Sequence, residues 1–321
     1  MARTPAALLV CFCFGLLWQS ASHAGQQAPP ISAKNLVGTW TLVTTESLDV
    51  EGGRTPVPMP RGVLVYDAAG HVLEVVTRLN RMPYAGAQAT PAEAQAAYAS
   101  YGGLFGMYRL DEAHGKISYH VDGSVNPNVM GHDEVRSYEL APNRLTITSV
   151  RPEPGAPGGM RWVWERIPNL ETLSPAHRRL VGFWQWVSER RVGNDGAVIG
   201  ETIRGPSTIV YTPAGYVGVH FTQRDRKAFA ADLPTDDEAK TAMTGYVGYY
   251  GVYGLFPGAV FHFRLGVLTP PGQVGDTYQR FYEISGSQIT LRFPPTIVQG
   301  QEARNVVTLR QISGEADMLG R

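Results

Sequence analysis

The sequence Leu36-Val37-Gly38-Thr39-Trp40 is repeated, with one change, as Leu180-Val181-Gly182-Phe183-Trp184. The same landmarks then follow each copy in the same order: a Tyr-x-x-x-Gly turn, an arginine-rich strand end, a capped helix, a run of glycines and tyrosines, and a closing arginine. A repeat this long exceeds a solenoid or propeller unit and is typical of a whole duplicated domain. We therefore expect two domains, residues 32–168 and 174–312, joined by a short linker.

Residues 1–24 have the features of an export signal. Arg3 supplies a positive start, an apolar run extends from Ala6 to Trp18, and small residues precede Ala24. The apolar run is too short for a comfortable membrane span, so cleavage after Ala24 is the better interpretation. The sequence thus predicts an exported protein, periplasmic or secreted, with no membrane span in the mature chain.

Composition narrows the function classes. Both cysteines, Cys11 and Cys13, lie in the predicted signal, so no disulfide is expected in the mature chain. The 28 basic and 28 acidic residues balance, which gives no electrostatic reason to expect nucleic acid as a partner. The histidines show no metal-ligand spacing, and no phosphate loop, dinucleotide fingerprint or Gly-x-Ser-x-Gly motif occurs. We therefore expect no metal and no cofactor, while the oligomeric state stays open.

Alternating apolar residues, enriched in β-branched and aromatic types, predict about eight short strands in each copy. In the first copy they are residues 38–48, 62–66, 71–78, 103–110, 116–125, 134–140, 144–150 and 160–167. One helix interrupts each set. Thr90 and Thr235 each begin a capping box, and the helices that start there extend to about Tyr101 and Gly245. Short helical turns precede Leu36 and Leu180. The predicted fold class is all-β: two tandem antiparallel barrels, with sandwiches as the alternative, each carrying one inserted short helix.

At this point the residues resemble a known family. The two Gly-x-Trp motifs are similar to the first strand of lipocalins, and the ordered pattern resembles the bacterial and fungal "lipocalin-like domain" proteins, here in two copies. The matching positions are Tyr66, Gly70, Gly106, Tyr108, His120, Ser124, Pro127, Asn128, Arg136 and Tyr138 in copy one, and Asp225, Arg226, Gly251, Tyr253, Arg280 and Tyr282 in copy two.

The resemblance implies more about fold than about function. It implies that Arg166 and Arg310, from the last strands, cover Trp40 and Trp184 and seal the barrel floors. Two departures from the pattern stand out: Asn80-Arg81 replaces Asp-Arg in copy one, and copy two reads Thr269-Pro270-Pro271 where Pro-Asn is expected. Members of this family mostly lack an established activity, and a fold does not fix a function.

Two groups of side chains are candidates for lining a pocket. The aromatic cluster Tyr98, Tyr101, Phe105 and Tyr108 is echoed by Tyr246, Tyr249, Tyr250 and Tyr253, with glycines between its members. Tyrosine offers an apolar body and a polar tip, which suits a flat or oily ligand, although each ring is equally well explained as core. The second group is Arg81, Asp225 and Arg226, which could hold a carboxylate at a barrel mouth or simply form a salt bridge within the domain.

Arg136 and Arg280 are the strongest single candidates, because Arg136, Tyr138 and Leu140 alternate on one face and Leu140 belongs inside. An arginine inside a barrel needs an anionic or carbonyl partner. Tyr282 follows Arg280 as Tyr138 follows Arg136. His120, with His262 as an approximate echo, could act as an acid–base catalyst or make one structural hydrogen bond.

These residues leave three functions open. The leading hypothesis is an exported two-barrel protein that binds a small, mostly apolar or aromatic molecule. The alternative is a cofactor-independent isomerase, cyclase or hydratase acting on a polyene- or terpenoid-like substrate, which rests on fold analogy alone. A third is a scaffold with two filled barrels.

Overall fold

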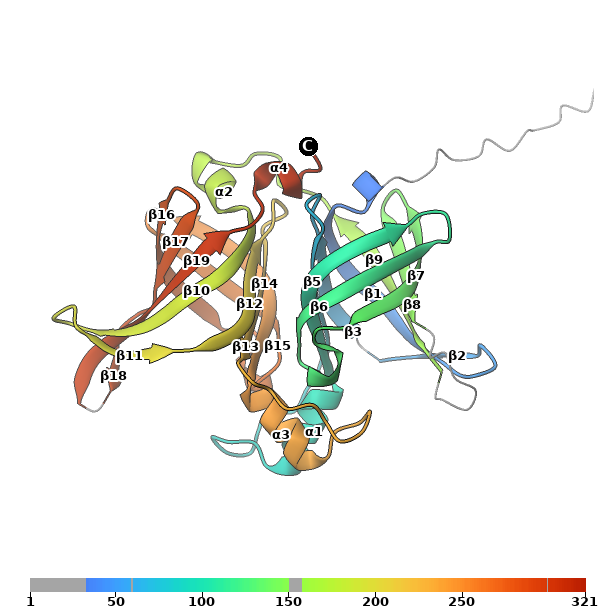
Figure 1. The fold of residues 1–321 in the computed structure, drawn as a ribbon, viewed down its shortest axis with the longest axis horizontal. Helices are drawn as coiled ribbons and strands as arrows, with labels where there is room; N and C mark the ends of the chain where they lie inside the picture. The colour runs from blue at the N-terminus through green and yellow to red at the C-terminus, as the bar shows by residue number, and fades with distance from the viewer. Residues whose placement is uncertain (1–32, 59, 150–157, 299) are drawn as a thin grey trace, which may run out of the picture. The chain divides into compact units, whose positions relative to one another are not determined.

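A computed structural model describes residues 33–58, 60–149, 158–298 and 300–321, in which the two sequence copies form two separate sheets (Figure 1). The predicted export signal at residues 1–24, and the end of the predicted strand at Val150, lie outside the described residues. In the described part of the chain no helix is long and apolar enough to cross a membrane.

The first copy forms a closed antiparallel barrel. Its elements are η1 (Ala33–Asn35), β1 (Gly38–Leu48), β2 (Arg54–Pro56), β3 (Pro60–Tyr66), β4 (His71–Arg78), α1 (Pro91–Ala99), β5 (Tyr101–Asp111), β6 (Lys116–Ser124), η2 (Pro127–Val129), β7 (Asp133–Ala141), β8 (Arg144–Ser149) and β9 (Met160–Ile167). Successive strands pair with one another from β3 to β9, and β1 pairs with both β3 and β9, which closes eight strands into a barrel. We call this barrel one.

The second copy repeats this plan as barrel two. Its elements are α2 (Pro175–Leu180), β10 (Gly182–Gly193), β11 (Val198–Thr202), β12 (Arg204–Tyr211), β13 (Tyr216–Gln223), α3 (Asp236–Thr244), β14 (Tyr246–Phe256), β15 (Ala259–Val267), η3 (Pro271–Gln273), β16 (Thr277–Ser285), β17 (Gln288–Arg292), β18 (Thr296–Val298), β19 (Gln301–Gln311) and α4 (Glu315–Met318). Here β10 pairs with β12 and β19, so this sheet also closes. The prediction of two tandem barrels, each with one inserted helix, is confirmed.

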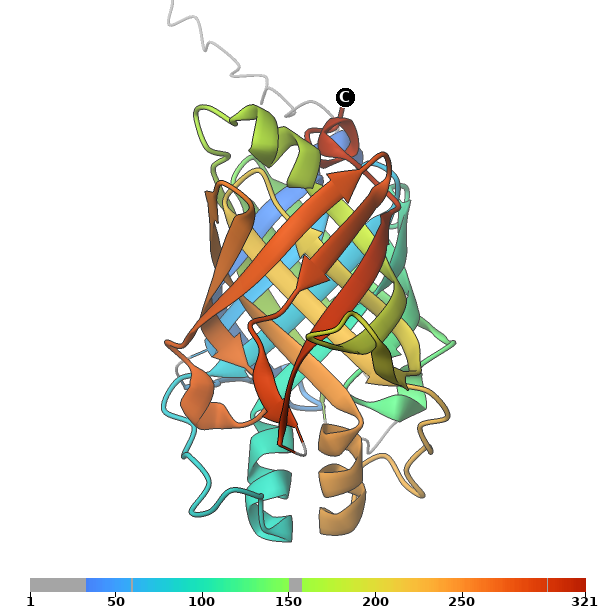
Figure 2. The same cartoon turned by 90° about the vertical axis from the view of Figure 1, so that its left-hand side faces the viewer.

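Both inserted helices begin at the capping boxes read from the sequence. The Thr90 hydroxyl accepts from the Glu93 backbone N–H while the Glu93 carboxylate accepts from the Thr90 N–H, and Thr235 and Glu238 repeat this exchange. Helices α1 and α3 pack against each other and lie side by side in two views (Figures 1 and 2).

Both barrels contribute to one hydrophobic cluster. Val63, Val75 and Phe105 of the first copy lie in it together with Phe183 and Tyr250 of the second. Each barrel also has a separate interior cluster around its own tryptophan. Because a shared core resists separation of its halves, the two copies are packed as one folded unit rather than as beads on a linker.

The Gly-x-Trp motif builds the closed end of each barrel. Trp40 and Trp184 are fully buried, and their indole N–H groups donate to the carbonyls of Leu36 (3.0 Å) and Leu180 (2.8 Å). Gly38 has φ +143°, and a Cβ there would collide with the Arg166 guanidinium. Glycine is therefore required where the chain passes under the arginine.

The predicted arginine latch is present in one barrel only. The Arg166 guanidinium lies 4.1 Å from the Trp40 ring centroid and donates to the carbonyls of Val37 and Asn35. In barrel two the prediction for Arg310 is wrong: strand pairing places Gln311, not Arg310, opposite Trp184. Gln311 donates to the Val181 carbonyl, and Arg310 is exposed. The second copy has one extra residue before this point, so counting from the tryptophans gives the wrong neighbour.

Candidate functional site

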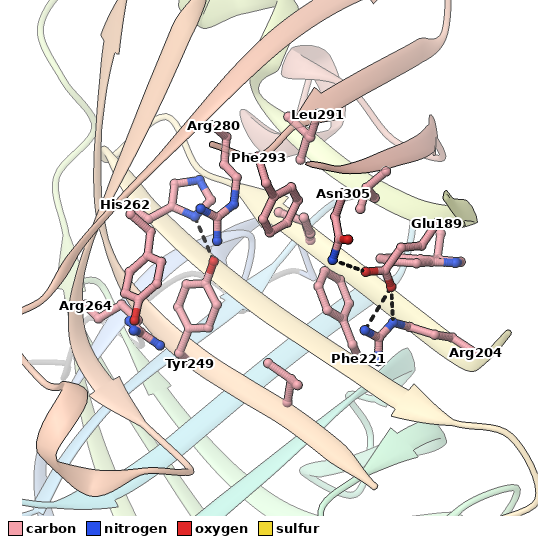
Figure 3. A pocket seen from close by; sticks show the side chains of 15 residues that line it. Glu189, Arg204, Phe221, Tyr249, His262, Arg264, Arg280, Leu291, Phe293 and Asn305 are labelled. Carbon is pink, nitrogen blue, oxygen red and sulfur yellow. Dashed lines mark hydrogen bonds and ion pairs between the residues drawn. The ribbon is translucent and has the colours of Figure 1, made fainter. Parts of the chain in front are cut away.

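Barrel two encloses a cavity of about 210 Å³ (Figure 3). It is lined by Trp186, Glu189, Arg204, Ile209, Phe221, Val247, Tyr249, His262, Arg264, Tyr278, Arg280, Leu291, Phe293, Asn305 and Val307. Aliphatic and aromatic groups form most of this wall, and the polar groups gather in two places. A cavity of this character is the usual form of a small-molecule site.

One polar group forms a hydrogen-bonded chain across residues of β12, β14 and β15. The two ring nitrogens of His262 contact the hydroxyls of Tyr211 (2.9 Å) and Tyr249 (2.8 Å). Burial, reinforced by the nearby Arg280 and Arg264, lowers the pKa of His262 to about 3. The imidazole is therefore neutral, so it accepts from one tyrosine and donates to the other.

Two arginines lie next to this chain. Both guanidinium carbons lie near the ring of Tyr278, at 3.5 Å from its centroid for Arg264 and 5.3 Å for Arg280. Arg280 also lies over Phe293 (3.9 Å) and donates to the neighbouring Gln279 carbonyl. Burial lowers the pKa of Arg264, which is 6% exposed. The basic side of the cavity is thus held against aromatic rings.

The second polar group is already paired. The Glu189 carboxylate accepts from the Arg204 guanidinium through Nε (3.0 Å) and Nη2 (2.9 Å), and its other oxygen accepts from Asn305 (2.9 Å). In Figure 3 this group lies across the cavity from Arg264 and Arg280, with Phe221 and Phe293 between the two sides. Glu189 therefore does not neutralise the basic side.

Barrel one fills the corresponding space with its own side chains. Strand pairing makes Arg136 the equivalent of Arg280, and its guanidinium donates to Glu74 (3.0 Å) and Glu134 (2.8 Å). Burial opposes the charge, but these two carboxylates outweigh it and raise the pKa of Arg136. Trp162 stacks on the same guanidinium at 4.9 Å, where barrel two has the smaller Val307. Arg136 points inward, as predicted. The anionic partners that it requires are Glu74 and Glu134 of the same barrel rather than a ligand.

A hollow of about 190 Å³ remains at the mouth of barrel one. Tyr101 and Trp162 are among its lining residues, and the buried Tyr101 hydroxyl has no hydrogen-bond partner in the described part of the chain. Tyr101, an aromatic site candidate of the first copy, therefore borders a hollow of its own barrel.

Arg81 and Arg226 lie between the barrels rather than in either cavity. The Arg81 guanidinium donates to the carbonyls of Val267 and Leu268 in barrel two and to Ala97 of α1. In the opposite direction, the Arg226 guanidinium of barrel two donates to the carbonyls of Ser124 and Val125 in barrel one. We call these two side chains the arginine clamps.

The residue before each clamp explains part of the pattern. Asn80 and Asp225 have φ +57° and +58°, a left-handed conformation that asparagine and aspartate tolerate better than most residues. Asp225 borders an open surface hollow and not the cavity of barrel two. The alternation of Asp and Asn at this position therefore reflects backbone geometry, because either residue turns the chain toward its clamp.

The remaining candidates do not border the cavity of barrel two. The hydroxyls of Tyr108 and Tyr253 donate to the carbonyls of Asp67 (2.7 Å) and Thr212 (3.0 Å), which fix the β3–β4 and β12–β13 turns. The Tyr246 hydroxyl contacts His220 in the shared core. Tyr138 and Tyr282 pack, half buried, against the interior clusters.

His120 lies on the outer face of barrel one, away from the inward-facing candidates. Its side chain is 52% exposed and its ring contacts Asp133 at 2.7 Å. His262 aligns with Tyr119, not with His120, because these two residues occupy the same place opposite β7 and β16. A shift of one residue along a strand moves a side chain to the other face.

Sequence reasoning found Arg280 and named Tyr249 and His262, but missed the other polar lining residues, Glu189, Arg204, Arg264 and Asn305. One signal was available for Arg264. It lies two residues after His262, so strand alternation places both on one face. Glu189 and Arg204 carried no such signal, because each lies next to a β-bulge that shifts the pairing register.

One family model agrees with this architecture. The family model for the lipocalin-like domain matches residues 37–167 and 181–312. Similar solved structures include a lipocalin-like protein from Bacteroides uniformis, with 12% identity and TM-score 0.24, covering 41% of this chain and 98% of that one. Another is a protein of unknown function from Nostoc punctiforme, of the DUF3598 family, with 12% identity and TM-score 0.22, covering 87% and 97%.

A third similar structure is an uncharacterised protein from Bacteroides eggerthii, with 17% identity and TM-score 0.22, covering 40% of this chain and 98% of that one. The search of curated proteins found no match. With the family model matching both copies, each along nearly its whole barrel, the chain belongs to the lipocalin-like domain family.

Proposed function

We propose that this protein is exported and binds a small, mostly apolar or aromatic molecule in the cavity of barrel two. The observation that carries the proposal is the contrast between the copies: Trp162 and the Arg136–Glu74 pair occupy the part of barrel one that corresponds to the cavity beside Val307 in barrel two, and the hollow that barrel one keeps lies at its mouth. The cavity wall is mainly aromatic and aliphatic, which favours a ligand with a large apolar part.

The size of the cavity limits the ligand. An engineered apolar cavity of roughly 150 Å³ binds benzene. The cavity of barrel two, at about 210 Å³, therefore suits a ligand of one or two rings, or a short aliphatic chain. Long-chain fatty acids exceed this volume.

The test places a tryptophan in the cavity at Val307, the position equivalent to Trp162 of barrel one. Isothermal titration calorimetry of the full chain uses naphthalene-2-methanol, 2-naphthoic acid, octanol and octanoic acid. We expect binding by at least one of these compounds and loss of that binding in Val307→Trp. The control is Val306→Trp, on the same strand but facing outward. Absence of binding by all four compounds, or equal binding by both variants, refutes the proposal.

One observation favours the enzymatic alternative, a cofactor-independent isomerase, cyclase or hydratase. The Tyr211–His262–Tyr249 chain reaches the cavity wall, and such a chain can carry protons. However, burial raises the pKa of Tyr249 and lowers that of His262. Neither group is then a strong acid or base near neutral pH, so binding remains the better supported function.

Hydrogen–deuterium exchange into a ligand distinguishes the two functions. Citral and sorbic acid, a small terpenoid and a small polyene acid, are incubated with the protein in D2O and followed by proton NMR. An enzyme of this kind incorporates deuterium at carbon or forms a new product, and Tyr249→Phe slows this reaction. Unchanged spectra for both compounds after prolonged incubation exclude the enzymatic alternative for these substrate classes.

A further inference from the structure

The cavity of barrel two carries positive charge that its own lining does not neutralise. Three arginines and one glutamate line it, and the glutamate, Glu189, is held by Arg204 and Asn305. Arg264 and Arg280 therefore share an excess of two positive charges. The one carboxylate within ion-pair distance of either, in the described part of the chain, is the half-exposed Asp276, at 3.7 Å from Arg264.

In barrel one, two carboxylates of the protein neutralise Arg136, the equivalent of Arg280. Glu74 and Glu134 bind Arg136, and strand pairing identifies their equivalents in barrel two as Val219 and Tyr278. Barrel two has thus kept the arginine, as Arg280, and has no carboxylate at either equivalent position. It also carries Arg264 where barrel one has Val121. These three differences leave the arginines of barrel two with less neutralising charge than Arg136 has in barrel one.

Arg264 is the more informative of the two arginines. It is 94% buried, and its Nε and Nη2 atoms make no hydrogen bond in the described part of the chain. The distance of 3.7 Å to Asp276 exceeds that of a good hydrogen bond. A buried guanidinium with unused donors destabilises a fold, so it needs a compensating role.

We propose that the ligand of barrel two is a small aromatic carboxylic acid whose carboxylate is bound by Arg264 and Arg280. This proposal rests on the proposed function and specifies its ligand class. The two guanidiniums lie against the same Tyr278 ring, and the Arg264 guanidinium also lies 5.5 Å from the centroid of the Tyr249 ring. Planar donors of arginine match the two oxygens of a carboxylate, while Phe221, Leu291 and Phe293 contact the ring system.

The test compares two compounds of nearly the same shape, 2-naphthoate and the neutral naphthalene-2-carboxamide, by calorimetry on the full chain. We expect the acid to bind at least about 10-fold more tightly than the amide, as hydrogen bonds to a charged group imply. This preference is lost in Arg264→Met and in Arg280→Met, whereas affinity for the amide persists. The control is Arg292→Met, an outward arginine of the same barrel that is paired with Glu283.

A second measurement separates recognition from a structural role. In the absence of ligand, Arg264→Met removes a buried charge with unused donors and should have a Tm at or above that of the unmodified protein. A clear fall in Tm with an unchanged preference for the acid makes Arg264 structural and overturns the proposal.

The outcomes also distinguish this proposal from the one it rests on. Equal affinity for the acid and the amide, with both lost in Val307→Trp, overturns the carboxylate but keeps the binding function. Failure of the acid, the amide and the other compounds to bind overturns both.

Discussion

The arginine clamps make the strongest prediction about stability. Arg81→Met keeps most of the apolar stem but removes the four hydrogen bonds that the guanidinium donates, to Ser100 Oγ and to the carbonyls of Ala97, Val267 and Leu268. Two of these acceptors belong to the other barrel. The substitution therefore weakens the contact between the barrels without changing either cavity wall, since Arg81 does not border the cavity of barrel two.

The magnitude follows from the number and setting of these bonds. Hydrogen bonds from a charged donor contribute about 1.5–3 kcal/mol each, but the half-buried site lets water reach some of the carbonyls after the change. We expect the free energy of unfolding to fall by about 2–4 kcal/mol, within the range for truncating one partner of a buried charged contact. For a protein of this size that corresponds to a decrease in Tm of about 3–7 °C.

Urea unfolding followed by tryptophan fluorescence measures the change, and Arg78→Met, at an exposed arginine three residues earlier, is the control. Arg226→Met should act similarly, because its guanidinium also bonds carbonyls of the other barrel. Binding of 2-naphthoate should keep the affinity of the unmodified protein in both clamp variants. Unchanged stability in both, or loss of ligand binding with unchanged stability, refutes the assignment of these arginines to the barrel contact.

Three further predictions concern other buried groups. Glu74→Gln should lower the free energy of unfolding by about 2–4 kcal/mol, because Arg136 loses one of its two counter-charges, and the double variant Glu74→Gln/Arg136→Met should recover part of that loss in a double-mutant cycle. Burial lowers the pKa of His220 and, together with neighbouring arginines, that of His262 to about 3, so the unfolded chain takes up protons that the native state excludes. Stability should therefore be full above pH 6.5 and fall as the pH drops toward 3, with a loss of about 1–3 kcal/mol between pH 7.5 and 5.5 in urea titrations; equal stability at both values contradicts the buried neutral state. Arg166→Gln, which copies the residue used by barrel two, should cost about 1 kcal/mol or less, and a much larger decrease in urea midpoint shows that the guanidinium over the indole is essential to the floor.

The fold was predictable because its signals are local. The Gly-x-Trp motifs and the capping boxes at Thr90 and Thr235 each act within a few residues, and all of them form the predicted structures. The short strands β2, β11 and β18 were not predicted. Each pairs with the far end of a neighbouring strand, and such pairing depends on the length of a hairpin rather than on a motif.

The site was less predictable, because it depends on register and on contacts between distant segments. The equivalence of His262 to Tyr119, not His120, follows from a one-residue difference between the copies. The clamp role of Arg81 requires knowing that Val267 lies beside it, which no local pattern indicates. Arg280 was found because it repeats Arg136, whose alternation with Tyr138 and Leu140 predicts an inward direction.

The shared core makes the two walls of the cavity in barrel two unequal. Strands β13, β14 and β15 pack against barrel one, so an outward movement of this wall has to break the contact between the copies. Strands β16, β17 and β19 make no comparable contact in the described part of the chain. Opening of barrel two for ligand exchange should therefore occur on the β16–β19 wall, with barrel one serving as a rigid support. Amide hydrogens of β14 should then exchange more slowly than those of β17.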